Sequence, residues 1–311
     1  MASVIAVLAG LLALAGGAEL LVGGAIGLAT RWRVSPLLVG LVLVAWGTSA
    51  PELAASAVAS ASGADALAVG NVSGSNLFNV GAVLAACALL APLHVDRVLA
   101  VRDAPLMLLA SVGVALAALD GVIGRVEGGV LLLALGAHTA WVVRAARREG
   151  GGAPAGDDAA PVRWPMTRVV GGLVFLGGGA RLLVTGSVAL ADAAGVDPRL
   201  VAVTVVAAGT SLPELFASMA ATRRGHLDVA VANVVGSNLF NLLGVLGVSA
   251  LVAPTGLHVR PWVGGVDLML ATLLAAVLLP VLWTGLRVSR AEGLGLGASY
   301  LGYLGWLAWS A

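Results

Sequence analysis

The chain has 311 residues, of which 59% are hydrophobic and 11% are charged, and its mean hydropathy is +1.02. An ordinary soluble domain carries roughly 25% charged residues, so this chain could not cover its surface with polar groups. That argues against a soluble enzyme, a disordered chain and a nucleic-acid-binding protein, and the net charge of +1 gives no field that would attract polyanions. The composition predicts an all-α integral membrane protein, because helices satisfy their own backbone hydrogen bonds in lipid.

Ten apolar stretches are long enough to cross a bilayer, which takes about 20 residues per helix. They cover residues 3–29, 35–61, 66–90, 100–119, 122–146, 165–190, 197–221, 226–252, 262–284 and 290–310. The first stretch has no positively charged region before it, so we expect a retained membrane helix rather than a cleaved signal peptide.

Arginines gather in alternate connectors between these stretches. Only Arg125, Arg199 and Arg260 fall in the other set of connectors. Because basic residues accumulate on the cytoplasmic side, this asymmetry predicts a multi-pass protein of the cell membrane with both termini extracellular. Residues 147–164, rich in glycine, proline, aspartate and alanine, are then a flexible cytoplasmic linker.

The two halves of the chain repeat each other at an offset of 162 residues. VAWGTSAPELAAS at 44–56 aligns with VAAGTSLPELFAS at 206–218, and NVSGSNLFN at 71–79 aligns with NVVGSNLFN at 233–241. Of the 64 aligned positions from Gly16 to Asn79, 35 are identical. Five spans separate the copies, an odd number, so the sequence predicts ten transmembrane helices as two inverted-topology repeats of five. The first half is 1–146 and the second is 165–311. Such repeats are typical of secondary transporters, whose site lies near the midplane.

Glu52 and Glu214 fall well inside apolar spans, where an ionised carboxylate costs at least a few kcal/mol. Each follows a proline, which frees a backbone carbonyl and is tolerated in a membrane where that carbonyl lines a cavity or finds a partner. Carboxylates beside bare carbonyls suit a hard cation such as Ca²⁺. The alternative is a buried glutamate that pairs with an arginine or stays protonated. The recurrence of the same polar motif, GTSAPE and GTSLPE, in both halves argues against this alternative.

Other oxygen-bearing side chains share faces with these glutamates. Thr48 and Ser49 lie one helical turn before Glu52, and Thr210 and Ser211 repeat this before Glu214. Ser75 and Asn79 share a face of the next span, as do Ser237 and Asn241. The remaining asparagines of these motifs are expected to hydrogen-bond between helices, and they are Asn71, Asn76, Asn233 and Asn238. No cluster of cysteine and histidine appears, so zinc and copper are poor candidates.

Glu19 and Arg181 occupy equivalent positions in the first and sixth spans. We expect them to have a structural role, paired with each other or with backbone groups.

GTSAPE followed by GSNLFN, and then GTSLPE followed by GSNLFN, closely resembles the two α-repeats of the calcium/cation antiporter superfamily. The sodium/calcium exchanger branch is the most similar, and the similarity covers nearly the whole chain. This resemblance implies a midplane cluster of ion sites in which Glu52 and Glu214 take Ca²⁺ or, alternately, Na⁺. It also implies that backbone carbonyls of Ala45 and Ala207 line outer sodium sites. The full implied set of ligands is Glu52, Glu214, Thr48, Ser49, Ser75, Asn79, Thr210, Ser211, Ser237, Asn241, Ala45 and Ala207.

The resemblance also bears on the coupling ion. Many prokaryotic exchangers and the potassium-dependent ones carry aspartate where this chain has Asn241, which argues against potassium dependence. The proton-coupled branch usually lacks the serine of GTSxPE, so H⁺/Ca²⁺ antiport is the alternative to Na⁺/Ca²⁺ antiport.

The expected partners are therefore Na⁺, Ca²⁺ and the lipid bilayer. We expect no resident cofactor, no covalent chemistry, no nucleic acid and no obligate protein partner. A cation channel and a non-transporting scaffold are the alternative hypotheses from other functional classes.

Overall fold

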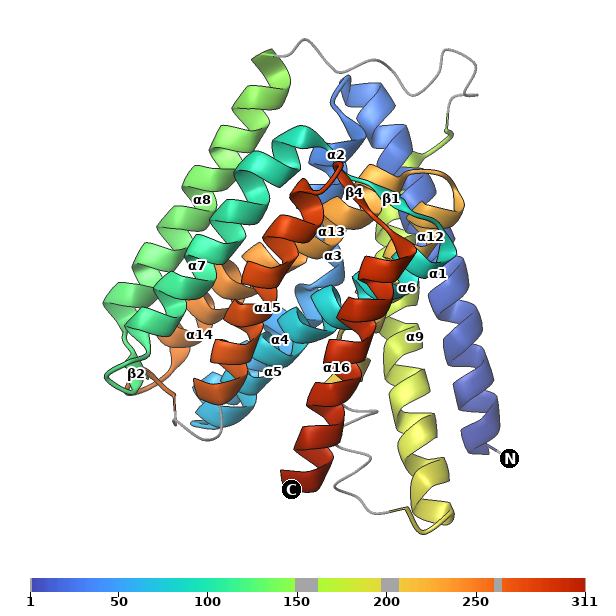
Figure 1. Cartoon of the computed structure of the whole chain (residues 1–311). Coiled ribbons are helices and arrows are strands. Elements are labelled where there is room, and N and C mark those ends of the chain that lie inside the picture. The colour runs from blue at the N-terminus through green and yellow to red at the C-terminus, as the bar shows by residue number, and fades with distance from the viewer. Residues whose placement is uncertain (1, 149–161, 197–206, 260–264, 311) are drawn as a thin grey trace.

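The computed structural model describes residues 2–148, 162–196, 207–259 and 265–310, and these residues are almost entirely helical (Figure 1). The first half contains α1 (Ala2–Trp32), α2 (Pro36–Leu38), α3 (Ala45–Thr48), α4 (Ala50–Ala61), α5 (Asp65–Phe78), α6 (Leu84–Leu90), α7 (Ala104–Ala117) and α8 (Arg125–Arg148). The second half contains α9 (Pro165–Ala193), α11 (Ala207–Gly209), α12 (Leu212–Arg223), α13 (Leu227–Leu239), α14 (Leu246–Val252), α15 (Val266–Trp283) and α16 (Arg290–Ser310). Short π-helical segments interrupt the spans at η1 (Val39–Val44), η2 (Asn79–Val83), η3 (Leu99–Asp103) and η5 (Phe240–Val245).

Seven helices in the described ranges are long and apolar enough to cross a membrane. An eighth span is counted if Pro36–Thr48 and Ala50–Ala61, which meet at a 43° bend, are taken together. The protein is therefore an integral membrane protein, as the composition predicts. The expected seventh span begins in residues that lie outside the described ranges, and α16 is not among the seven. The count of ten stays a prediction.

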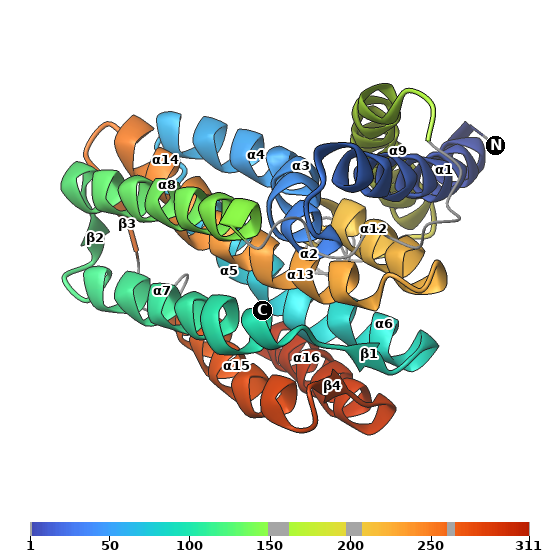
Figure 2. The same ribbon diagram turned by 90° about the horizontal axis from the view of Figure 1, so that it is seen from above.

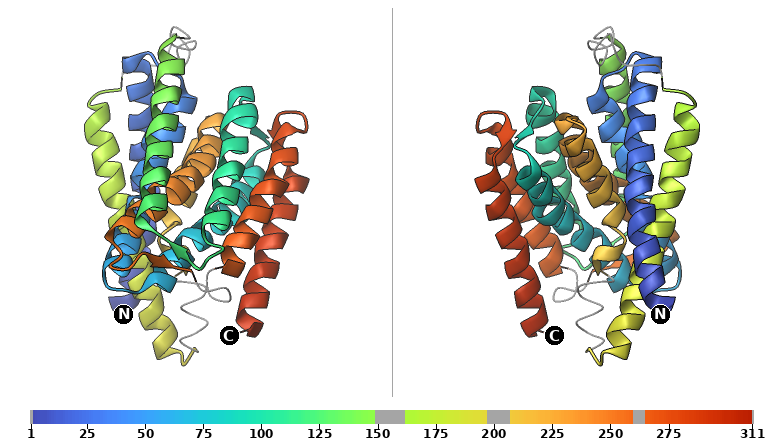
Figure 3. Two further views of the ribbon diagram at one scale, coloured as in Figure 1. Left: turned by 90° about the vertical axis from the view of Figure 1, so that its left-hand side faces the viewer. Right: turned by 90° about the vertical axis from the view of Figure 1, so that its right-hand side faces the viewer.

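Helices α1 and α9 lie side by side along one flank and run in opposite directions (Figures 1 and 3). Their contact is made through glycines spaced by seven residues. A Cβ added at Gly17 would lie 2.9 Å from the carbonyl oxygen of Gly172, and one at Gly172 would lie 2.6 Å from the backbone nitrogen of Leu21. Only glycine allows the two backbones to approach this closely, which is the usual basis of tight helix packing in membranes.

Helices α5 and α13 begin the two most buried spans, and the interrupted helices α3–α4 and α11–α12 pack against them. Helix α3 ends at Thr48, and Pro51 in the first turn of α4 sets the new helix direction after Ser49. Gly63 and Gly225 then end α4 and α12 with positive φ angles of 76° and 80°. The backbone N–H groups of Ala64 and His226 close these ends on carbonyls five residues back. The two halves therefore use the same local signals at positions 162 residues apart.

Two short antiparallel ribbons connect the halves. Strand β1 (Leu93–His94) pairs with β4 (Arg287–Val288), and β2 (Val122–Ile123) pairs with β3 (Leu257–His258). Figure 1 shows the first ribbon near one end of the bundle and β2 near the opposite end. Each ribbon takes one strand from each half, so the halves are joined at both ends of the molecule.

Helices α7, α8, α15 and α16 surround the remaining sides of the centre (Figure 2). Between η3 and α8, the buried Asp103 accepts hydrogen bonds from Arg102 at 2.9 and 2.8 Å and lies 2.9 Å from Nε2 of His138. This buried carboxylate therefore has two polar partners, as a buried acidic group requires.

Candidate cation site

Glu52 and Glu214 lie at the centre of the fold, each in the first turn of its helix, α4 or α12. Both residues are completely buried. A helix N-terminus favours negative charge, because its unpaired N–H groups carry partial positive charge. The broken helices thus place two acidic groups where their own backbone helps to stabilise them.

Each carboxylate is held by a serine from the opposite half. The hydroxyl of Ser49 donates to Oε1 of Glu214 at 2.7 Å, and the hydroxyl of Ser211 donates to Oε1 of Glu52 at 3.0 Å. Both serines occupy the break between a short helix and the helix that carries the glutamate. The crossed pairs bring the two copies of the GTSxPE motif into direct contact.

Several buried oxygen atoms of the residues implied as ligands have no hydrogen-bond partner. They are Oε2 of Glu52, Oε2 of Glu214, Oγ of Ser75, Oδ1 of Asn79 and Oδ1 of Asn241. In the described part of the chain these make up five of the nine buried side-chain oxygens without a partner. The five lie on α4 and α12 and on α5, η2 and η5, which pack against those two helices. An unpaired buried polar atom is costly, so this set of oxygens fits a bound cation. All of them are hard oxygen donors, the type that suits Ca²⁺ and Na⁺ rather than zinc or copper.

The other residues implied as ligands make hydrogen bonds of their own or adjoin residues outside the described ranges. Ser237 donates to the carbonyl of Ala45 at 3.4 Å, and Thr48 donates to the same carbonyl at 3.3 Å. Thr210 is half-buried and donates to Oδ1 of Asn71 at 3.2 Å, so the two threonines are not equivalent here. Ala207 is the first residue of α11 and follows a stretch outside the described ranges.

The asparagines expected to bond between helices do so. Asn71 donates to the hydroxyl of Ser56 at 2.9 Å, and Asn233 donates to the hydroxyl of Ser218 at 2.9 Å. Ser56 and Ser218 lie one turn after the glutamates and are buried. Their role was not predicted, although both halves carry the same serine at that position, a signal that could have pointed to them.

Glu19 does not pair with Arg181. Its carboxylate accepts hydrogen bonds from Nε and Nη2 of Arg224, at the turn that follows α12. The sequence could not identify Arg224 as the partner of Glu19, because the fold brings it to α1 from a position 205 residues away.

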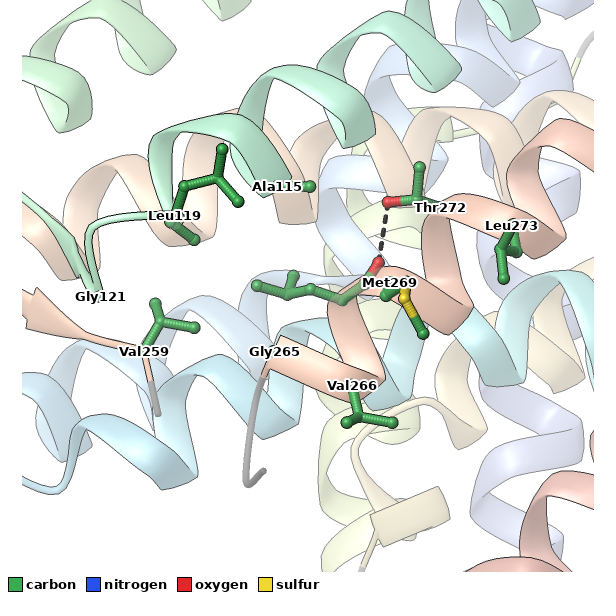
Figure 4. Close-up of a pocket in the computed structure, with 11 residues that line it drawn as sticks. Ala115, Leu119, Gly121, Val259, Gly265, Val266, Met269, Thr272 and Leu273 are labelled. Atoms are coloured by element: carbon green, nitrogen blue, oxygen red, sulfur yellow. Dashed lines mark hydrogen bonds between the residues drawn. The ribbon is translucent and has the colours of Figure 1, made fainter. Parts of the chain in front are cut away.

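Two further observations bear on where else a metal ion could bind. Within the described ranges, no three side chains of histidine, cysteine, aspartate or glutamate gather as a metal cluster. An apolar pocket of about 480 Å³ lies between α7 and α15 (Figure 4), and the hydroxyl of Thr272 in its wall is already bonded to the carbonyl of Leu268.

A buried, all-oxygen cluster at the centre of apolar helices is the arrangement of a membrane protein that handles hard cations. The model of the family described as sodium/calcium exchanger protein matches residues 2–144 and 164–309. The chain therefore belongs to the sodium/calcium exchanger family and is a membrane antiporter of that class, which confirms the resemblance found in the motifs.

Individual relatives support this assignment, and the similarity extends over nearly the full length of the chain. The chain is 35% identical to the putative antiporter CaxA of Alkalimonas amylolytica over 97% of this chain and 98% of that protein. It is 28% identical to the sodium/calcium exchanger MaX1 of Methanosarcina acetivorans, with 96% of each chain covered. The solved structure of the sodium-calcium exchanger NCX_Mj soaked with Na⁺ and Sr²⁺ is similar at a TM-score of 0.83 and 30% identity, over 96% of both chains.

Proposed function

We propose that this chain is a secondary active antiporter that exchanges Na⁺ for Ca²⁺ by alternating access. The observation that carries the proposal is the set of unpaired, buried oxygens on Glu52, Glu214, Ser75, Asn79 and Asn241. The printed names of MaX1 and NCX_Mj, both sodium/calcium exchangers, support the same choice of ions.

The charge of the site explains why exchange is obligatory. With Glu52 and Glu214 ionised and asparagines at positions 79 and 241, the ligands carry a net charge of about −2, which one Ca²⁺ or two Na⁺ neutralise. Without ions, two charges stay buried among apolar helices, at a cost of at least a few kcal/mol each. Only forms that carry ions can therefore pass between the two access states, and with three Na⁺ bound the site carries one net positive charge.

We assign the ion ligands as the set implied by the family motifs. It comprises Glu52, Glu214, Thr48, Ser49, Ser75, Asn79, Thr210, Ser211, Ser237, Asn241 and the backbone carbonyls of Ala45 and Ala207. The crossed serine–glutamate bonds and the unpaired oxygens of Ser75, Asn79 and Asn241 support this set.

The proposal includes ten spans in two inverted repeats of five, residues 1–146 and 165–311, joined by the linker 147–164. The antiparallel course of α1 and α9 and the hydrogen bonds repeated at an offset of 162 support it. We also propose that both termini face the cell exterior and the linker the cytoplasm. The start of α1 and the end of α16 lie at one end of the molecule, and the end of α8 at the other (Figure 1).

Energy sets the proposed stoichiometry. A 10⁴-fold Ca²⁺ gradient costs about 5.5 kcal/mol, and moving two charges against about 100 mV adds roughly 4.6 kcal/mol. A tenfold Na⁺ gradient with the same potential supplies about 3.7 kcal/mol per ion. Three Na⁺ per Ca²⁺ are then sufficient and two are not.

The test is ⁴⁵Ca²⁺ uptake into three sets of proteoliposomes. One set is loaded with Na⁺, one is loaded with K⁺, and one has an outward-directed proton gradient across its membrane. We expect uptake only with internal Na⁺. Uptake driven by protons alone would move the protein to H⁺/Ca²⁺ antiport, which is the alternative. Uptake with no counter-ion would instead make it a channel.

A further inference from the structure

Four buried asparagines form a reciprocal network behind the cation site. Nδ2 of Asn79 donates to Oδ1 of Asn238 at 3.0 Å, and Nδ2 of Asn241 donates to Oδ1 of Asn76 at 3.0 Å. Asn76 and Asn238 in turn donate to each other's backbone carbonyls, at 3.5 and 3.4 Å. None of the four residues is more than 4% exposed.

The backbone carbonyls fix the direction of every amide in this network. A carbonyl oxygen only accepts, so the NH₂ groups of Asn76 and Asn238 must face the backbone of the opposite half. Their Oδ1 atoms then face Asn241 and Asn79, and only an NH₂ group can satisfy an acceptor in that position. As a result, Oδ1 of Asn79 and Oδ1 of Asn241 are turned away from the network and have no partner.

We propose that Asn76 and Asn238 are positioning residues, which hold the amide oxygens of Asn241 and Asn79 as cation ligands. The inference rests on the proposed cation site and adds to it two residues that bind no ion themselves. It follows from the difference between an amide and a carboxylate. A carboxylate presents an oxygen in either orientation, whereas a reversed amide would present its NH₂ donors to the cation.

This arrangement lets the site keep ligand oxygens from two glutamates and two asparagines with only two charged side chains. Asn76 and Asn238 supply the orientation that a neutral amide ligand lacks. Replacing Asn241 by aspartate should therefore be unfavourable. The new carboxylate oxygen would face Oδ1 of Asn76, and both atoms are hydrogen-bond acceptors.

The test is a double-mutant cycle on ⁴⁵Ca²⁺ binding to the purified full-length protein in detergent. Asn76→Leu removes the acceptor that holds Asn241, and we expect at least about tenfold weaker Ca²⁺ binding, as for loss of a hydrogen bond that orients a ligand of a charge. Asn241→Asp alone creates the acceptor–acceptor contact. In that background, we expect Asn76→Leu to strengthen binding rather than weaken it, so the effect of the same substitution reverses in sign.

Matched variants keep the result interpretable. Asn76→Ala repeats the cycle without added volume, and Asn238→Leu with Asn79→Asp repeats it on the mirror pair. Ser73→Ala, on the same helix, removes a hydroxyl that bonds only within its helix, to the carbonyls of Val69 and Gly70, and should leave binding unchanged.

Weakening by the same factor in both backgrounds would show that Asn76 only packs, and would overturn the inference. If the unsubstituted protein binds no Ca²⁺, the proposed function fails and this inference fails with it. Binding by the unsubstituted protein without a sign reversal removes the positioning role alone.

Discussion

Ser49 and Ser211 each hold a carboxylate that belongs to the other half of the chain. Ser49→Ala removes a hydroxyl 2.7 Å from Glu214 and leaves that buried oxygen without a donor. A hydrogen bond to a charged group contributes about 1.5–3 kcal/mol, so we expect the apparent Ca²⁺ affinity in Na⁺-driven uptake to fall about tenfold or more. Ser73→Ala is the control, and an equal effect of both variants would contradict a specific role for Ser49.

At the level of single residues, the sequence predicts which side chains matter better than it predicts their partners. Glu52, Glu214 and the flanking serines stand out because polar residues recur inside apolar spans. The crossed bonds between them join residues more than 150 positions apart, which spacing along one helix cannot reveal. Asp103 and His138 were not singled out for the same reason, since their contact joins η3 to α8.

The close contact of α1 with α9 depends on glycines at single faces of both helices. Gly17→Ala places a Cβ 2.9 Å from the backbone of α9, whereas a Cβ at the neighbouring Gly16 meets nothing within 4 Å. Overpacking costs about 1–3 kcal/mol, so we expect Gly17→Ala to lower the thermal unfolding temperature in detergent and Gly16→Ala to leave it unchanged. A comparable loss in both variants would contradict a specific packing role for Gly17, because the higher helix propensity of alanine favours stability at both positions.

Helix bounds follow from the sequence to within a few residues for most of the spans. The expected spans 3–29 and 165–190 correspond to α1 and α9, and 226–252 corresponds to Leu227–Val252. The π-helical segments and the size of the bend at Ser49 were not predicted, because they depend on tertiary packing around η1, η2 and η5 rather than on hydropathy. The proline before each glutamate did indicate where the backbone would break.

Transport by the whole molecule should be electrogenic. If three Na⁺ leave a proteoliposome for each Ca²⁺ that enters, one net positive charge moves outward in each cycle. An inside-positive potential, set with valinomycin and external K⁺, should therefore speed Na⁺-driven ⁴⁵Ca²⁺ uptake, and an inside-negative potential should slow it. Equal initial rates at both potentials would contradict the proposed stoichiometry of three to one.

The architecture of the whole molecule was predictable to the extent that the repeat is visible in the sequence. The offset of 162 predicts that the two halves fold alike, and the bond of Asn71 with Ser56 in the first half recurs as the bond of Asn233 with Ser218 in the second. The β1–β4 and β2–β3 ribbons were not predicted, because two-residue strands leave no periodic signal.

In the proposed mechanism, one buried site built on Glu52 and Glu214 holds either Ca²⁺ or Na⁺. The most direct measurement is ⁴⁵Ca²⁺ binding to the purified protein at rising Na⁺ concentration, with K⁺ at equal ionic strength as the control. We expect Na⁺ to displace Ca²⁺ completely and K⁺ to leave it bound, and Glu214→Gln to abolish binding. Calcium that stays bound at saturating Na⁺, or that still binds to the Glu214→Gln variant, would contradict a shared site.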